Sequence, residues 1–108
     1  DLEIVLSGWG SDYADPMTDI ELFVTNGGNN HSSYSNPKYD ELIKTANNSS
    51  DNKVRMQAMR DAEKILGDDM PVGVMLYSTR VIMLNPKIKN VYFKGIGAEY
   101  YLYDAYVE

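Results

Sequence analysis

The sequence predicts a mixed α/β fold in which three helices stand between β segments, in the order β-α-α-α-β-β-β. Three observations lead to this prediction. The chain opens on an alternating apolar run at residues 2–7, and a proline directly follows an Asp or Asn at 15–16 and 36–37. After Pro71 the sequence becomes rich in β-forming residues, as in VGVMLYSTRVIML. β segments on both sides of a block of helices favour an α/β domain, or part of one, with a mixed sheet.

The first predicted element is a strand over residues 2–7, with the sequence LEIVLS. Its apolar side chains at Leu2, Ile4 and Leu6 share one face, as alternation along a strand requires. Val5 adds an apolar side chain to the other face, which is typical of a strand covered on both sides. A serine and a glycine then end the run.

The first helix is predicted to begin at Asp15-Pro16. The Asp15 carboxylate suits the N-cap position, where it accepts hydrogen bonds from free backbone N–H groups. Pro16 suits the first helical position, where its missing N–H costs nothing. The helix should end near Thr25, because the loop-forming run NGGNNHSS follows. The apolar residues at helical spacing are Met17, Ile20, Phe23 and Val24.

Two longer helices follow, and each has a predicted cap. Asn36-Pro37 repeats the cap-plus-proline pattern, and Asp51 is the predicted N-cap of the third helix. Gly67 is the predicted C-terminal cap of that helix, and Arg55 is placed on its solvent face. The predicted buried positions are Tyr39, Leu42, Ile43 and Ala46 in the second helix, and Val54, Ala58, Ala62, Ile65 and Leu66, with Met59 beside them, in the third.

The rest of the chain is predicted to be β structure. Two strand segments, or one bent strand, are expected at 72–77 and 80–84. A turn at NPKIKN, short β structure at VYFKG and a final strand in EYYLYDAYVE are expected to follow. The tyrosines of the last segment favour a half-buried strand of amphipathic rings, and a stacking platform for a ligand such as a sugar is the second interpretation. They are Tyr100, Tyr101, Tyr103 and Tyr106.

The composition excludes several classes of function. The 108 residues carry a formal net charge of −6, and the Lys and Arg residues form no run. Nucleic acids and anionic membrane surfaces are therefore not expected as partners, since both are bound by clustered basic side chains. With no cysteine and one histidine, thiolate chemistry and a multi-histidine metal site within this chain are excluded. No segment approaches the roughly 20 apolar residues of a transmembrane helix.

The segment GWGSDYADP places a carboxylate, Asp12, in a turn with two aromatic rings, Trp9 and Tyr13. The glycines Gly8 and Gly10 let another backbone approach this turn closely. Asp12 is either a turn residue that caps local amides or an ion-pair partner for a cationic group. An ammonium group at such a site gains cation–π attraction of roughly 0.5–2 kcal/mol from an aromatic face. Spacing alone leaves both interpretations open.

Metal binding and acid–base catalysis are less well supported at this turn. Asp12, Asp15 and Asp19 have a spacing similar to a calcium loop, but Pro16 interrupts it and the central glycine is absent. A small hydrolase using Asp12 and Asp15 as acid and base is disfavoured, because Asp15 already suits a helix cap. Asp68-Asp69 fits a solvated turn better than a catalytic pair.

Four segments in the same order resemble the C-terminal part of family 5 extracellular solute-binding proteins, the oligopeptide- and dipeptide-binding components of ABC importers. They are GWGSDYADP, YSNPKYDELI, AEKILGDDMPV and the closing β-rich segment. The resemblance covers nearly all of the chain and implies a fragment of a periplasmic-binding-protein type II-like lobe. Residues 1–79 would belong to the ligand-binding lobe, and residues 80–108 would be a tail that returns to the other lobe.

The resemblance also implies a function. Members of the family bind a solute without catalysis or a cofactor, and they lie lipid-anchored outside the cell membrane or free in the periplasm. Their partners are a peptide ligand and the membrane permease of the importer. In peptide-binding members, the aspartate of the G-W-x-x-D segment takes the α-ammonium group of the ligand. Here that residue is Asp12, with Trp9, Gly10 and Tyr13 around it, and Tyr77 corresponds to the ligand-facing tyrosines.

The same family leaves alternatives for the ligand and for assembly. Oligosaccharides, nickel chelates and haem are the non-peptide candidates. The chain enters directly at a strand, as expected of a fragment, and its tail would then lack its home sheet. Exposed strand edges favour association, so a strand-swapped or edge-paired oligomer is expected. The isolated chain should bind peptide poorly, because the second lobe would be missing.

Overall fold

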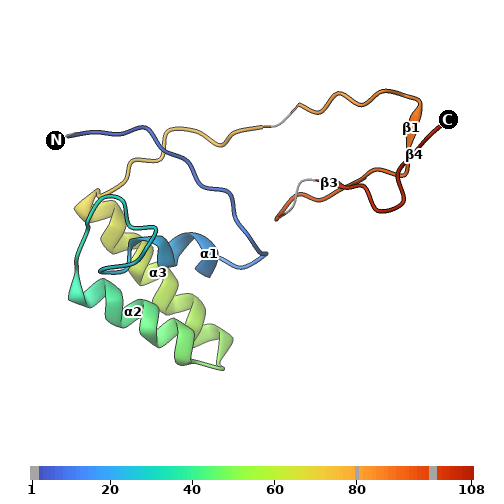
Figure 1. The fold of residues 1–108 in the computed structure, drawn as a ribbon. Helices are drawn as coiled ribbons and strands as arrows, with labels where there is room; N and C mark the ends of the chain where they lie inside the picture. The colour runs from blue at the N-terminus through green and yellow to red at the C-terminus, as the bar shows by residue number, and fades with distance from the viewer. Residues whose placement is uncertain (1–2, 80, 98–99) are drawn as a thin grey trace. The chain divides into compact units, whose positions relative to one another are not determined.

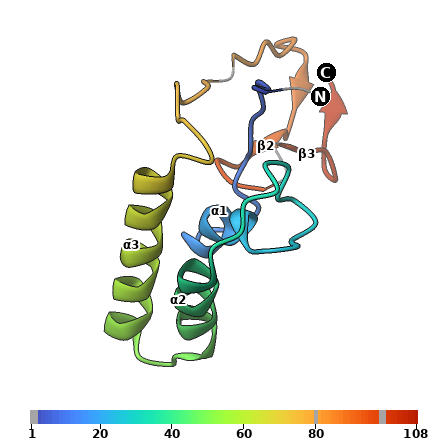
Figure 2. The same ribbon diagram turned by 90° about the vertical axis from the view of Figure 1, so that its left-hand side faces the viewer.

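The computed structural model describes residues 3–79, 81–97 and 100–108, and it confirms the mixed α/β class (Figures 1 and 2). The chain divides into two compact units. Asp15–Met75 holds the helices of the described residues, and Asp1–Ala14 together with Leu76–Glu108 holds the strands. Within the described ranges, no helix is both long and apolar enough to cross a membrane.

The helical unit consists of one short helix and two long ones. α1 spans Met17–Ile20 and continues as a 3-10 turn, η1, over Glu21–Phe23. α2 spans Pro37–Asn48 and α3 spans Asn52–Asp69, and these two helices lie side by side in both views. Their apolar faces and that of α1 form one core, made of Met17, Tyr39, Ile43, Ala46, Ala58, Met59, Ala62 and Leu66.

Tyr39 is the largest fully buried side chain among the described residues. Its ring meets Tyr34 edge-on, with 5.8 Å between the ring centroids, and its hydroxyl donates a hydrogen bond to the carbonyl oxygen of Ile20. Burial raises the pKa of the Tyr39 hydroxyl, so it stays a protonated donor. This hydrogen bond ties the start of α2 to the end of α1.

The helix starts confirm the predicted cap chemistry. Oδ1 of Asn36 accepts hydrogen bonds from two N–H groups in the first turn of α2, at 3.0 and 3.3 Å. Asp51 accepts one from the first turn of α3 at 2.8 Å. Oδ1 of Asp15 accepts one from the N–H of Met17 at 2.8 Å, although α1 begins one residue later than its proline predicted.

The predictions for Gly67 and Val54 in α3 were wrong. Gly67 does not end the helix, which continues to Asp69. Met70 takes the left-handed cap conformation instead, with φ of 50°, and donates its N–H to the carbonyl oxygen of Leu66 at 2.9 Å. Val54 is 47% exposed rather than buried, because periodicity fixes the face of a helix and not how far along it the neighbouring helix extends.

Asp69 closes α3 and does not stand in a separate solvated turn. Its carboxylate accepts hydrogen bonds from the hydroxyl of Tyr34 at 2.6 Å and from Nδ2 of Asn36 at 2.8 Å. These two bonds, that of Tyr34 first, hold the pKa of Asp69 below its usual value. Asp69 therefore connects the end of α3 to the residues that lead into α2.

The strands form a narrow antiparallel ribbon. β1 spans Ile88–Lys89, β2 Tyr92–Phe93, β3 Tyr100–Tyr101 and β4 Tyr106–Val107. β1 pairs with β4 and β2 pairs with β3. The segment that contains β1 and β2 therefore pairs at two places with the segment that contains β3 and β4. Asn90, with φ of 56°, lies between the two pairings. The predicted β structure at VYFKG is confirmed, and the predicted final strand is two short strands with a turn between them.

The strands predicted at 2–7 and 72–77 join no ladder in the described part of the chain. The same holds for 81–84, while residues 2 and 80 lie outside the described residues. Apolar side chains along these segments are open to solvent, as shown by Ile4, which is 91% exposed. Alternation and β-forming residues predict an extended chain, but a strand also needs a neighbour for its N–H and C=O groups.

Candidate functional site

The turn from Trp9 to Tyr13 presents a carboxylate and two rings to solvent. Trp9 is 47% exposed and Tyr13 is 45% exposed, and Asp12 between them is exposed as well. The structure brings these residues together because they are close in sequence. Asp12 and Tyr13 each also take part in a further interaction within the chain.

The backbone of this turn is held by the ribbon. The N–H of Gly97 donates a hydrogen bond to the carbonyl oxygen of Ser11 at 3.3 Å. The glycines within the turn, Gly8 and Gly10, were expected to let another backbone approach closely, and the described residues show no such approach. A Cβ at Gly8 or Gly10 would meet no atom within 4 Å, so neither glycine serves a close backbone approach in the described chain.

Asp15 acts in the fold of the helical unit. Besides capping α1, its carboxylate forms a two-pronged ion pair with Arg55 of α3, at 2.6 and 2.8 Å. The prediction that Arg55 lies on the solvent face was wrong, since its side chain is 23% exposed in this pair. The guanidinium of Arg55 first, and then the N–H of Met17, hold the pKa of Asp15 below its usual value.

We expect this ion pair to make the stability of the helical unit depend on acidic pH. Because the Asp15 pKa is lower in the folded state, its stabilising effect is present above its ordinary value of 3.8 and is lost as pH falls through the folded pKa. Unfolding midpoints measured from about pH 6 to pH 2.5 should fall less steeply for Asp15→Asn than for the native chain. Asp68→Asn, on the exposed end of α3, is the control, and an Asp15→Asn profile parallel to the native one would contradict the assignment.

The tyrosines predicted as ligand contacts lie on open segments. Tyr77 is 93% exposed, so the structure does not enclose it together with the turn. Tyr101 and Tyr103 stack with their ring centroids 6.0 Å apart, and Nζ of Lys94 lies 4.6 Å from the Tyr101 ring. The rings of Tyr101 and Tyr103 thus contact each other, and the ammonium group of Lys94 already lies over the Tyr101 ring.

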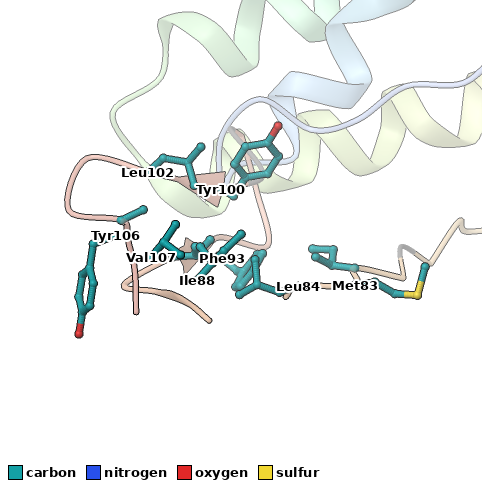
Figure 3. A pocket seen from close by; sticks show the side chains of 11 residues that line it. Met83, Leu84, Ile88, Phe93, Tyr100, Leu102, Tyr106 and Val107 are labelled. Carbon is teal, nitrogen blue, oxygen red and sulfur yellow. The ribbon is translucent and has the colours of Figure 1, made fainter. Parts of the chain in front are cut away.

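An open apolar pocket of about 390 Å³ lies on the ribbon and the segment before it (Figure 3). Its lining contains no carboxylate and none of Trp9, Gly10, Asp12, Tyr13 and Tyr77, so it is not the predicted ammonium site. The pocket is lined by Ile82, Met83, Leu84, Ile88, Val91, Phe93, Tyr100, Leu102, Ala105, Tyr106 and Val107.

Among the described residues, no group of three or more His, Cys, Asp and Glu side chains could hold a metal ion.

Known proteins with similar sequences carry the names of binding proteins. No family model matches the chain. The oligopeptide-binding protein OppA of Bacillus subtilis is 34% identical over 102 residues, which are 94% of this chain and 19% of that protein. The periplasmic oligopeptide-binding protein OppA of Haemophilus influenzae is 30% identical over 97 residues, which are 90% of this chain and 17% of that protein.

Two solved structures share the fold of the chain. The substrate-binding domain of an oligopeptide ABC transporter from Bacillus anthracis matches with a TM-score of 0.86 and 36% identity, over 94% of this chain and 20% of that one. The pheromone receptor PrgZ, whose structure reports a mode of peptide binding, matches with a TM-score of 0.74 and 38% identity, over 95% of this chain and 19% of that one. The chain thus spans about a fifth of the length of these relatives.

Proposed function

Because the chain is related over nearly its whole length to the oligopeptide-binding proteins of ABC transporters, we propose that it forms part of the peptide-binding component of an ABC importer. The observation that carries this proposal is joint agreement of sequence and fold, with 36% identity and a TM-score of 0.86 over 94% of the chain. Since the chain spans about a fifth of these relatives, binding is tested on the complete protein that contains it.

Within that function, we assign the peptide's α-ammonium group to Asp12. The carboxylate is exposed beside two rings that are each about half exposed, so a ligand amine can reach it. The ion pair strengthens as water is excluded, and the face of Trp9 or Tyr13 adds cation–π attraction. The turn is open in this chain, so the surface that excludes water would come from the peptide itself and from the rest of the complete protein.

Tyr77 would contribute to binding the main chain of the peptide. Its hydroxyl both donates and accepts, and the side chain extends from an open segment. An extended peptide offers N–H and C=O groups along its length, and contacts of this kind do not depend on its side chains. Such a site would accept peptides of varied sequence.

The expected partner outside the ligand is the membrane permease of the importer, and the expected place is the periplasm or the outer side of the cell membrane. The relatives support the coarse form of this proposal, since one carries the word periplasmic in its name and another is a domain of an ABC transporter. Lipid anchoring is part of the proposal and is tested by whether radiolabelled palmitate is incorporated into the complete protein in cells.

A ligand screen tests the proposed function against its alternatives. Tetra-alanine at 100 times its dissociation constant should stabilise the complete protein by roughly 2.7 kcal/mol and raise its unfolding midpoint. Maltotriose, a nickel–histidine chelate and haem at matched concentrations should leave the midpoint unchanged. A shift with one of these three and none with peptides would replace the peptide assignment.

We also propose that the 108-residue chain associates with itself through its open extended segments. Leu6 and Met83 are 85% and 95% exposed, and apolar chain of this kind without a ladder partner favours edge pairing. Light scattering across a concentration series should show dimers or larger species, and a monomer at all concentrations would contradict this proposal.

A further inference from the structure

We propose that Gly97 is a positioning residue for the Asp12 turn, so that the segment directly after β2 sets the direction of the carboxylate toward a ligand amine. The inference has a structural part and a binding part, and the binding part rests on the proposed function. Its structural part stands on three observations within one compact unit, which contains both Asp1–Ala14 and Leu76–Glu108.

The first observation is a direct backbone link. The N–H of Gly97 donates to the carbonyl oxygen of Ser11, the residue that precedes Asp12, at 3.3 Å. In Figures 1 and 2 the segment that directly follows β2 comes close to the blue N-terminal segment. Because this hydrogen bond restrains the backbone next to Asp12, the Asp12 side chain can point in only a restricted range of directions. A change at Gly97 would therefore change that range.

The second observation is the space at this contact. A Cβ on Gly97 would lie 3.2 Å from the carbonyl oxygen of Asp12, which is tighter than ordinary van der Waals contact. Both atoms are fixed to the backbone, so neither can swing away as the end of a long side chain could. A larger residue at position 97 therefore moves either the segment after β2 or the Asp12 peptide.

The third observation is the backbone conformation. Gly97 has φ of 78°, a region that residues with a Cβ enter only at a cost in free energy. Gly95, two residues earlier in the same segment, has no such φ, and a Cβ added to it would meet no atom within 4 Å. The two glycines thus differ in what a substitution would do, which makes Gly95 a matched control for Gly97.

The segment that contains Gly97 follows β2, which is paired with β3 and is held further by a contact of Lys94. β2 and β3 pair in the register Tyr92 with Tyr101 and Phe93 with Tyr100. Lys94 follows β2 directly, and its Nζ lies over the Tyr101 ring at 4.6 Å from the centroid. The segment therefore leaves a defined base, and its contact with Ser11 connects the tail of the chain to the proposed amine site.

The structural part is tested by NMR on the 108-residue chain. Gly97→Ala should shift the amide resonances of Ser11, Asp12 and Tyr13, whereas Gly95→Ala should leave them in place. Resonances of α2 and α3 should be unchanged in both variants, which shows that the helical unit is intact. Unmoved turn resonances in Gly97→Ala would overturn the inference, whatever the ligand of the complete protein is.

The binding part is tested by calorimetry on the complete protein with tetra-alanine and its N-acetyl form. Gly97→Ala should weaken tetra-alanine by about 10- to 100-fold, the range of a charge-assisted hydrogen bond, and the acetylated peptide by much less. Gly95→Ala should match the native protein with both. Equal losses for the two peptides in Gly97→Ala would contradict a positioning role. If Asp12→Asn also fails to distinguish them, the assignment of the peptide amine to Asp12 fails, while the NMR result still decides the structural link.

Discussion

Asp12→Asn in the complete protein is expected to weaken the binding of tetra-alanine by roughly 3–5 kcal/mol, which is about 100- to 4,000-fold. Asparagine keeps the shape of the side chain and removes its charge. The ligand ammonium group would then lie in a desolvated site without its counter-ion, and that is the costly situation for a buried pair. Isothermal titration calorimetry of the two proteins measures the difference directly.

The acetylated peptide separates recognition of the amine from damage to the site. N-acetyl-tetra-alanine carries no ammonium group, so it should bind the native protein weakly and lose little more in Asp12→Asn. Asp61→Asn, an exposed substitution on α3, is the control for loss of one negative charge. A drop of the same size for both peptides would remove Asp12 from the role assigned to it.

Tyr39→Ala is expected to lower the free energy of unfolding of the helical unit by roughly 3–5 kcal/mol, as truncation of a large buried ring does. The ring is fully buried in the core of the helical unit, and neighbouring side chains relax only partially into the space that truncation leaves. Urea denaturation of the 108-residue chain, followed by circular dichroism at helical wavelengths, measures this change.

Tyr39→Phe divides that loss into its two parts. It keeps the ring and removes the hydroxyl that donates to the carbonyl oxygen of Ile20, so a loss of roughly 1–3 kcal/mol is expected. Tyr103→Ala, at an 89% exposed position, should cost little and serves as the control. If Tyr39→Phe were as stable as the native chain, the hydrogen bond to Ile20 would contribute nothing to stability.

Much of the helical unit could be predicted because its signals are local. Asn36 and Asp51 bind N–H groups two or three residues away, and such contacts depend on neighbouring residues alone. The apolar periodicity of α2 and α3 likewise identified most of the core. The end of α3 was missed because the left-handed conformation falls on Met70, a residue type that gives no signal for it.

The contacts that could not be predicted join residues far apart in sequence. Arg55 reaches Asp15 across 40 positions, and no spacing in the chain indicates that pair. The contact of Gly97 with Ser11 is of the same kind. A strand is also a long-range structure, so the segments at 2–7 and 72–77 could be identified as β-forming without showing what they would pair with.

The candidate turn was identified by its composition, and its role still depends on the ligand. Trp9, Asp12 and Tyr13 were predicted from the residue types alone, and the structure adds that they are open to solvent and anchored through Ser11. What a carboxylate beside two rings binds cannot be derived from geometry without the ligand in place. The proposed class of ligand, peptides, rests on the similarity to oligopeptide-binding proteins.

A crystal structure of the complete protein with tetra-alanine bound would test the role of Asp12 most directly. If Asp12 takes the peptide amine, the N-terminal nitrogen of the peptide should lie about 2.7–2.9 Å from a carboxylate oxygen of Asp12, within reach of the Trp9 or Tyr13 ring. A peptide whose amine pairs with another acidic residue, or points to solvent, would contradict this central claim.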